Sequence, residues 1–387
     1  MSEGASLRSA PTPYPSLAGR GVRSPLWLAV PSRFAGIARN RAIVVAISLL
    51  LALALAWSAL AVADPTDLPT SAETSTSDLL MYEGVIEGLR AGGDYYRVTA
   101  DALRAGGYPL KPFVTFRLPT HAVVQAALPS MASVVLQYLL AIAVACAWWV
   151  RLRAVLIRPA ARLSAAILLA AGLVAFVQSG LVAFHEIWAA QLVALALALR
   201  TSERWVPSVA LGLIAMLVRE TAALLPLVMV VCAWREGQRR EAAGWSLALL
   251  ALALVLVAHG WAVSQVVGPL DPASPGWSGL LGPGFFVRAL AAATALQVVP
   301  LVLAAPLVAL ALFGWAAWRD PLATRTAALF AGYALAIAIL ARADTFYWAL
   351  MPAPVLLAGL AFAPDGLRDL WAALLDRRRV RVQTVRQ

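Results

Sequence analysis

The segment between residues 64 and 121 holds the carboxylates that could do chemistry in this chain. Asp78 opens a short amphipathic stretch, and Asp94 follows Gly92-Gly93 and precedes Tyr95-Tyr96. A carboxylate in such a place can act as a general base, taking the proton of an attacking hydroxyl. Aspartate is also a common helix N-cap and turn former. Both the catalytic and the structural interpretation therefore stay open for each residue.

A second set of residues could bind an anion. Arg117 precedes an apolar run, Arg219 is followed by Glu220 inside one, and Arg342 lies shortly before the last run. Arginine suits phosphate because its planar guanidinium can donate two parallel hydrogen bonds. The alternative for Arg219 is a structural ion pair with Glu220 or with Glu186. For Arg342 the alternative is a cap on a turn, beside aromatic residues that anchor at the membrane interface.

Long apolar runs must position these side chains. The 387 residues are 61% hydrophobic and only 13% charged, whereas soluble domains carry about 25% charged residues. Several runs exceed the roughly 20 residues that cross a bilayer as a helix. The sequence therefore predicts an all-α polytopic membrane protein of about ten transmembrane helices. The expected apolar runs are 42–63, 130–150, 163–199, 205–234, 242–262, 296–318, 324–341 and 346–363.

The distribution of charge sets the orientation. Of the 31 basic residues, 23 lie in the two terminal segments and in short Arg-rich connections, while 12 of the 20 acidic residues lie on the opposite side. Basic loops stay in the cytoplasm, so we expect both termini inside and the acidic loop 64–121 in the periplasm of a bacterial inner membrane. Three parts follow: a disordered basic N-terminus (1–41), a transmembrane domain (42–363) and a basic cytoplasmic tail (364–387).

Two apolar runs have Arg-rich flanks at both ends, so each must cross the membrane an even number of times. The pair His185-Glu186 marks the outward turn of the run 163–199, and Arg219-Glu220 marks that of 205–234. The second run leaves only about 22 Å of helix for each leg, at 1.5 Å a residue. The hydrocarbon layer is about 30 Å thick. We therefore expect Arg219-Glu220 at the floor of an outward-facing, water-filled recess.

The acidic loop contains a local repeat. Leu-Arg-Ala-Gly-Gly occurs at 89–93 and again at 103–107. Glycine after a basic residue is typical of a helix C-terminus. The repeat predicts two short surface helices, over 79–90 and 97–105, with Thr120 a candidate N-cap for the chain entering the second span.

The loop resembles the first outer loop of GT-C membrane glycosyltransferases, in particular the bacterial mannosyltransferase-like branch that uses polyprenyl-phosphate sugars. The resemblance is carried by Asp78-Leu-Leu-Met-Tyr82 and by Gly92-Gly93-Asp94-Tyr95-Tyr96. It implies that Asp78 is the catalytic base and that Asp94, Tyr82 and Tyr96 accompany it. No second acid adjoins Asp78, which leaves the use of a divalent cation open.

The resemblance implies transfer of a sugar from a polyprenyl-phosphate donor to a glycan, lipid or protein acceptor at the periplasmic face. Beyond Asp78 and Asp94, the residues expected to bind the substrate are Tyr82, Tyr96, Arg117, Glu186, Arg219, Glu220 and Arg342.

The same residues also bear on other possible functions of the chain. The net charge of +11 does not indicate nucleic-acid binding, because the arginines lie between apolar runs. The two cysteines and three histidines form no metal-binding pattern. A secondary transporter or flippase would place charges at mid-depth and repeat its halves; we find neither. A non-catalytic role in envelope assembly stays open. For a transferase, the chemical class of the acceptor also stays open.

Overall fold

The computed structural model describes residues 24–63 and 69–376, with the backbone alone from 69 to 77. Every regular element in these residues is helical, and β-structure is confined there to two isolated bridges. The predicted all-α class is confirmed. Asp64 and Asp67 of the acidic loop, residues 1–23 of the expected basic N-terminus and residues 377–387 of the tail lie outside the described residues.

Five helices of the described chain are long and apolar enough to cross a membrane. Large apolar side chains on them face outward; Leu139, Leu254 and Val257 are each more than half exposed, as expected where lipid takes the place of water. These five spans are α1 (Arg39–Trp57) with the 3-10 turn that extends it to Ala61, α5 (Ser130–Val155), α6 (Pro159–Leu173) with the 3-10 turn that extends it to Val177, α10 (Arg239–Ser264) and α13 (Pro321–Leu340).

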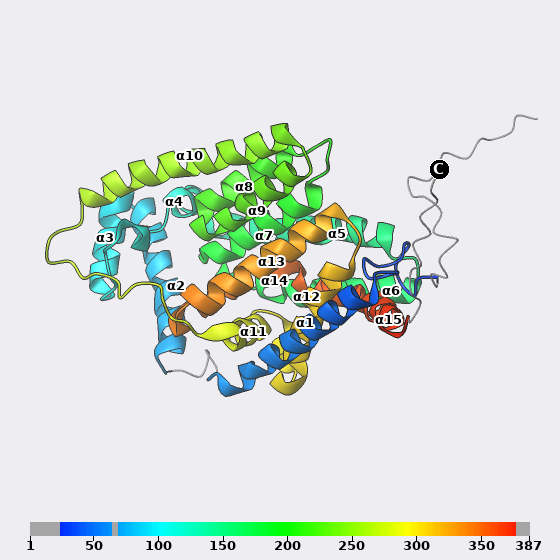
Figure 1. The fold of residues 1–387 in the computed structure, drawn as a ribbon. Coiled ribbons are helices and arrows are strands. Elements are labelled where there is room, and N and C mark those ends of the chain that lie inside the picture. Colours follow the sequence, from blue (N-terminus) through cyan, green and yellow to red (C-terminus); the bar gives the residue numbers. More distant parts are fainter. Residues whose placement is uncertain (1–23, 64–68, 377–387) are drawn as a thin grey trace, which may run out of the picture.

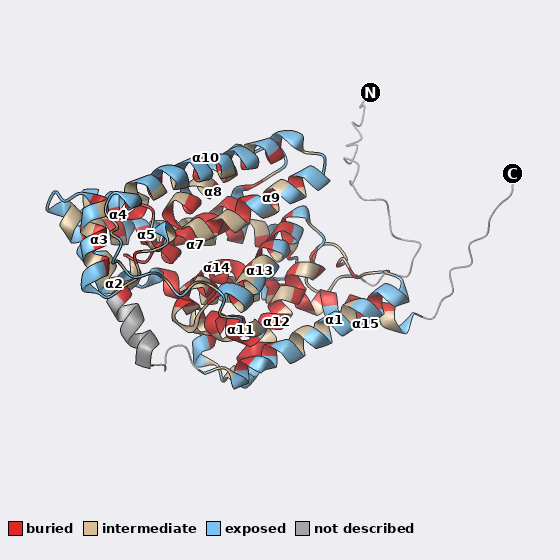
Figure 2. Ribbon diagram, turned by 60° about the vertical axis from the view of Figure 1, so that its left-hand side comes forward, coloured by how far each residue is buried: buried red, intermediate tan, exposed pale blue. Residues whose placement is uncertain are grey.

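The remaining helices of the bundle are shorter. Of these, α7, α11 and α14 are mostly buried (Figure 2), whereas α8, α9 and α12 also expose large apolar side chains, among them Ile214, Val231 and Leu303. These shorter helices are α7 (His185–Leu199), α8 (Val206–Val218), α9 (Leu224–Arg235), α11 (Gly282–Ala292), α12 (Leu301–Ala317) and α14 (Ala353–Leu356).

Each of the two apolar runs 163–199 and 205–234 is divided into two helices near the expected turn. The chain between α6 and α7 turns through two short 3-10 segments just before His185. Helix α8 ends at Val218, and a 3-10 turn over Glu220–Ala223 leads into α9. With 13 and 12 residues, α8 and α9 are about 20 Å and 18 Å long at 1.5 Å a residue. The turn between them therefore lies within the bundle.

The acidic loop folds as helices at one end of the bundle. They are α2 (Pro69–Arg90), α3 (Tyr95–Ala105) and α4 (Thr120–Ala127), drawn at the left of Figure 1. Both Gly-Gly pairs end a helix as predicted: Gly92 and Gly107 take positive φ of 87° and 69°, which glycine tolerates without steric cost. Thr120 is the first residue of α4, and its predecessor Pro119 holds the N-cap position.

The Arg-rich connections meet at the opposite end. Arg200 on the α7–α8 connection bonds to Glu241 at 2.6 Å, and Arg325 at the start of α13 bonds to Glu236 at 2.7 Å. Helix α15 (Ala363–Leu375) lies at this end too, at the right of Figure 1. These pairs show that the connections before α8, before α10 and before α13 lie together at this end.

Two expectations need correction. Residues 24–41, part of the segment expected to be disordered, are held in place: Asp365 of α15 accepts hydrogen bonds from the backbone N–H groups of Leu26, Trp27 and Leu28 at 2.6–2.9 Å. The run 346–363 is a series of short helical pieces between residues 343 and 361 instead of one regular span. Its residues from Ala349 to Gly359 are almost all buried among other helices, so tertiary packing stabilises a shape that an isolated helix would not take.

Candidate functional site

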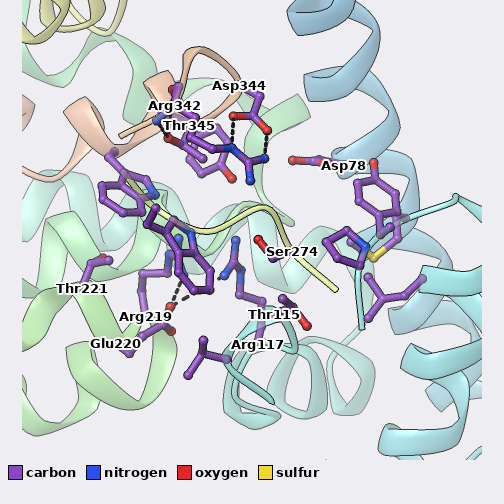
Figure 3. A pocket seen from close by; sticks show the side chains of 18 of the residues that line it. Asp78, Thr115, Arg117, Arg219, Glu220, Thr221, Ser274, Arg342, Asp344 and Thr345 are labelled. Atoms are coloured by element: carbon purple, nitrogen blue, oxygen red, sulfur yellow. Dashed lines mark hydrogen bonds and ion pairs between the residues drawn. The ribbon is translucent and has the colours of Figure 1, made fainter. Parts of the chain in front are cut away.

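A cavity of about 400 Å³ lies where the acidic loop meets the bundle. Helix α2 contributes Asp78 and Tyr82, the chain before α4 contributes Arg117, and the α8–α9 turn contributes Arg219 and Glu220. The segment after α13 adds Arg342, Asp344 and Tyr347. Figure 3 shows these groups around one space, with Asp78 on the side of Asp344 and the Arg219–Glu220 turn across from it. The structure therefore unites residues more than 250 positions apart.

Asp78 is a buried carboxylate in the interior of α2, with 6% of its surface exposed. The N-cap interpretation is therefore wrong for this residue, because α2 begins at Pro69. Burial raises the pKa of Asp78 above its usual range, and a hydrogen bond with Tyr108 and the charge of Arg117 oppose that rise. A carboxylate with a raised pKa is better matched to proton transfer near neutral pH than an ordinary one.

Asp94 is placed elsewhere. Its side chain caps α3 by accepting a hydrogen bond from the backbone N–H of Arg97 at 3.1 Å, and it is exposed outside the cavity. The catalytic role expected for Asp94 is corrected to a helix cap, for which aspartate is well suited. Tyr96 also lies outside the cavity, with its hydroxyl 3.2 Å from Nδ1 of His259. It is therefore not in position to bind the same ligand as Asp78.

The cationic side of the cavity is a network of charges. Arg219 is buried between two carboxylates: its Nε lies 2.5 Å from Oε1 of Glu186, and its Nη1 bonds to Glu220. Arg117 donates to the hydroxyl of Tyr82 at 3.2 Å, and its Nη1 lies 3.7 Å from Glu220. Glu186 is almost fully buried behind Arg219 and does not line the cavity. Its predicted partnership with Arg219 is present, whereas direct contact with a ligand in this cavity is not available to it.

Arg342 occupies the opposite wall. Its guanidinium forms a bidentate pair with Asp344, and its backbone N–H donates to the hydroxyl of Thr345. The pair closes the turn after α13, as the capping interpretation predicted. Because the side chain of Arg342 is still 30% exposed, it can also reach a ligand in the cavity.

Several lining residues were not singled out from the sequence. Ser274 and Trp277 come from the 265–281 connection, and Tyr108 and Trp348 flank the cavity from two other segments. The connection is bound to the segment after α3: the backbone N–H of Leu110 donates to the carbonyl of Pro272 at 2.9 Å, and that of Ser274 donates to the carbonyl of Lys111 at 2.6 Å. The run of prolines at 269, 272 and 275 with a tryptophan was the available signal, since prolines hold a chain extended.

The residues that the structure describes contain no group of three or more histidine, cysteine or acidic side chains arranged to hold a metal ion. Asp78 and Asp344 are the acids that face each other through the cavity, and Asp344 is already bonded to Arg342. The divalent cation left open by the sequence therefore has no ready ligand set in this part of the chain.

The arrangement can accept a proton at Asp78 and stabilise negative charge at Arg117, Arg219 and Arg342 within one cavity. Aromatic side chains around it offer flat apolar faces for a ring-shaped ligand. Comparison of the chain with protein-family models, with curated proteins and with solved structures finds no match.

Proposed function

We propose that this chain is an integral-membrane glycosyltransferase of the GT-C type, which moves a sugar from a polyprenyl-phosphate donor to an acceptor at the periplasmic face. One observation carries the proposal: a buried carboxylate with a raised pKa, Asp78, shares a 400 Å³ cavity with three arginines. A base for the acceptor and a cationic site for a leaving phosphate are the two groups that such a transfer needs.

The chemistry assigns each side of the cavity a task. Asp78 accepts the proton of the acceptor hydroxyl. At the same time the oxygen of that hydroxyl bonds to the anomeric carbon of the sugar. The bond between that carbon and the phosphate oxygen breaks, and the electron pair leaves with the phosphate. Arg117, with help from Arg219 or Arg342, stabilises the charge on the departing phosphate. Attack from the face opposite the phosphate inverts the sugar.

The proposed topology has ten crossings in a bacterial inner membrane, with both termini in the cytoplasm. It is supported by the Arg-rich connections at one end and by the cavity at the other. In a cysteine-free variant (Cys146→Ala, Cys232→Ala), Ser202→Cys is expected to react with an impermeant maleimide only from the cytoplasmic side. Glu83→Cys is expected to react only from the periplasmic side; the reverse pattern would put Asp78 on the wrong face for the donor.

Transfer itself is tested with radiolabelled polyprenyl-phosphate sugars and purified protein in proteoliposomes. We expect Asp78→Asn to insert and fold normally but to lose transfer by about 10²- to 10⁴-fold, the usual contribution of a general base. Glu83→Gln, a change of the same kind on the exposed face of α2, is the control and should keep full activity. Movement of the donor across the membrane without cleavage would support a flippase instead, and full activity of Asp78→Asn would remove it as the base.

A further inference from the structure

A second cavity, of about 310 Å³, lies beside the first. Apart from Gln178 and Gln297, its lining is aliphatic or aromatic, and none of its lining residues is charged. The volume is at the lower end of the range for pockets that bind small molecules. In contrast to the cavity around Asp78, this one has nothing with which to bind a phosphate.

The two cavities share a wall. Tyr347 lines both, and its ring packs edge-on against that of Phe184 with 5.4 Å between the ring centroids. Phe184 faces the apolar cavity and in turn contacts Tyr82 of the first cavity, at 6.0 Å between centroids. An aromatic layer one side chain thick therefore separates the apolar space from the polar one.

Two segments run from one cavity into the other. In α2, Asp78 lines the first cavity and the next residue, Leu79, lines the second. After α13, Asp344 and Thr345 line the first, and Phe346 and Leu350 line the second. The apolar cavity therefore adjoins the Asp78 side of the site, whereas Arg219 and Glu220 belong to the α8–α9 turn on the far side (Figure 3).

The rim of the second cavity suits an amphiphilic ligand. Gln178 and Gln297 are exposed, and each is adjacent to an exposed valine: Val177 is 51% and Val298 82% exposed. Amide and apolar groups side by side at the end of apolar helices are suited to the interfacial layer of a bilayer, where a lipid presents both kinds of surface. A lipid that enters from the membrane could pass this rim with its hydroxyl first, and its apolar chain would follow into the cavity.

From these observations we infer that the acceptor is a lipid: its apolar chain occupies the second cavity, and its hydroxyl passes the Tyr347 wall to reach Asp78. This inference rests on the proposed glycosyl transfer. The hydrocarbon chain of the donor is assigned elsewhere, because the donor phosphate is assigned to Arg117, which lines the first cavity and not the second, whereas the second cavity adjoins Asp78.

The test uses a long-chain alcohol that carries a diazirine in its alkyl chain, added to the full-length protein in nanodiscs. After irradiation, peptide mapping is expected to find label on residues 174–184, 292–298 and 346–350. Ala293→Phe, which fills the second cavity, should remove most of that label. The matched control, Ala295→Phe, changes a similarly half-buried alanine of the same segment that does not line the cavity, and it should keep the label.

Two further outcomes would each overturn the assignment of the second cavity to a lipid acceptor. If an excess of polyprenyl phosphate displaces the label, the cavity holds the chain of the donor and the inference is wrong. If Ala293→Phe leaves the label unchanged, the alcohol is bound only at the lipid-facing surface and the inference is likewise wrong. Specific labelling in a protein that performs no Asp78-dependent transfer would support the lipid-binding cavity but remove the proposed enzymatic function. Failure of the inference and failure of the proposed function are therefore distinguishable.

Discussion

Arg219 and Glu186 form a buried ion pair between the α8–α9 turn and the first turn of α7, with Nε and Oε1 2.5 Å apart and each side chain at most 2% exposed. Arg219 also bonds to Glu220. Two carboxylates therefore compensate one guanidinium. The sequence suggested Arg219 as a phosphate ligand. Its two carboxylate partners indicate instead that its first role is to hold the α8–α9 turn beside α7.

Removal of that guanidinium should destabilise the fold. Arg219→Gln leaves Glu186 buried and unpaired, and loss of one partner of a buried pair costs about 3–5 kcal/mol. We expect a markedly lower Tm in detergent and partial recovery in the double variant Glu186→Gln/Arg219→Gln, where no charge is left unpaired. A wild-type Tm combined with a raised donor KM would instead make Arg219 a direct ligand of the phosphate.

Arg117 is expected to contribute most to donor binding. Its guanidinium lines the cavity, is about 17% exposed and has its nearest carboxylate 3.7 Å away, a looser pairing than that of Arg219. A hydrogen bond to a charged group is worth about 1.5–3 kcal/mol, so Arg117→Gln should raise the donor KM by roughly 10- to 100-fold. Arg97→Gln, on the exposed face of α3, is the control. An unchanged donor KM in Arg117→Gln would exclude phosphate binding at this residue.

The pH dependence of transfer should report Asp78. The base acts only when it is ionised, and burial raises its pKa above that of an ordinary aspartate. We therefore expect activity to rise with pH through a midpoint above about 3.9, the value for an exposed aspartate. Asp78→Asn should lose that acidic limb.

The same shift affects folding. Because folding raises this pKa, the protonated form is favoured in the folded state, and its contribution to stability is present at low pH and lost as pH rises through the raised pKa. Asp78→Asn should therefore be at least as stable as the wild type at neutral pH, as measured by thermal unfolding. A clear loss of stability there would show that the ionised carboxylate is a structural group.

The 265–281 connection over the cavity is held by Asp271. Arg104 of α3 donates to both carboxylate oxygens of Asp271 at 2.8 and 2.9 Å, and this bond lowers the pKa of Asp271 to about 2. The attachment should therefore persist down to that pH. Asp271→Asn should release it and speed hydrogen exchange at residues 270–278. Glu87→Gln breaks a single, longer Arg–Glu contact of 3.5 Å within α2 and should leave exchange in the 265–281 connection unchanged.

Sequence patterns predicted the parts of the fold that depend on local chemistry. Apolar length predicted the long helices, the charged pairs predicted the breaks between helices at His185 and Arg219, and the Gly-Gly pairs predicted the ends of α2 and α3. The start of α2 was placed too late, because its first turns lack the apolar pattern that marks a buried helix. That error led to the N-cap interpretation of Asp78.

The site was predicted only in part, since it depends on contacts between distant segments. Asp78, Tyr82, Arg117, Arg219, Glu220 and Arg342 meet in the cavity, and Asp94 and Tyr96 do not. The motif that joined Asp78 with Asp94 covered neighbouring residues in the loop, whereas the cavity is completed by residues 340–348. No local pattern encodes that approach, because it results from how α2 packs against the segment that follows α13.

The attachment of residues 26–28 to Asp365 affects the order in which the chain assembles. The acceptor carboxylate lies 337 to 339 positions downstream of the donors, so ribosomes must synthesise the chain through residue 365 before residues 26–28 can dock. Until then these N–H groups need water or other partners, since buried backbone donors are almost always satisfied. A nascent chain stalled before residue 365 should consequently expose its beginning to protease, and completion of α15 should protect it.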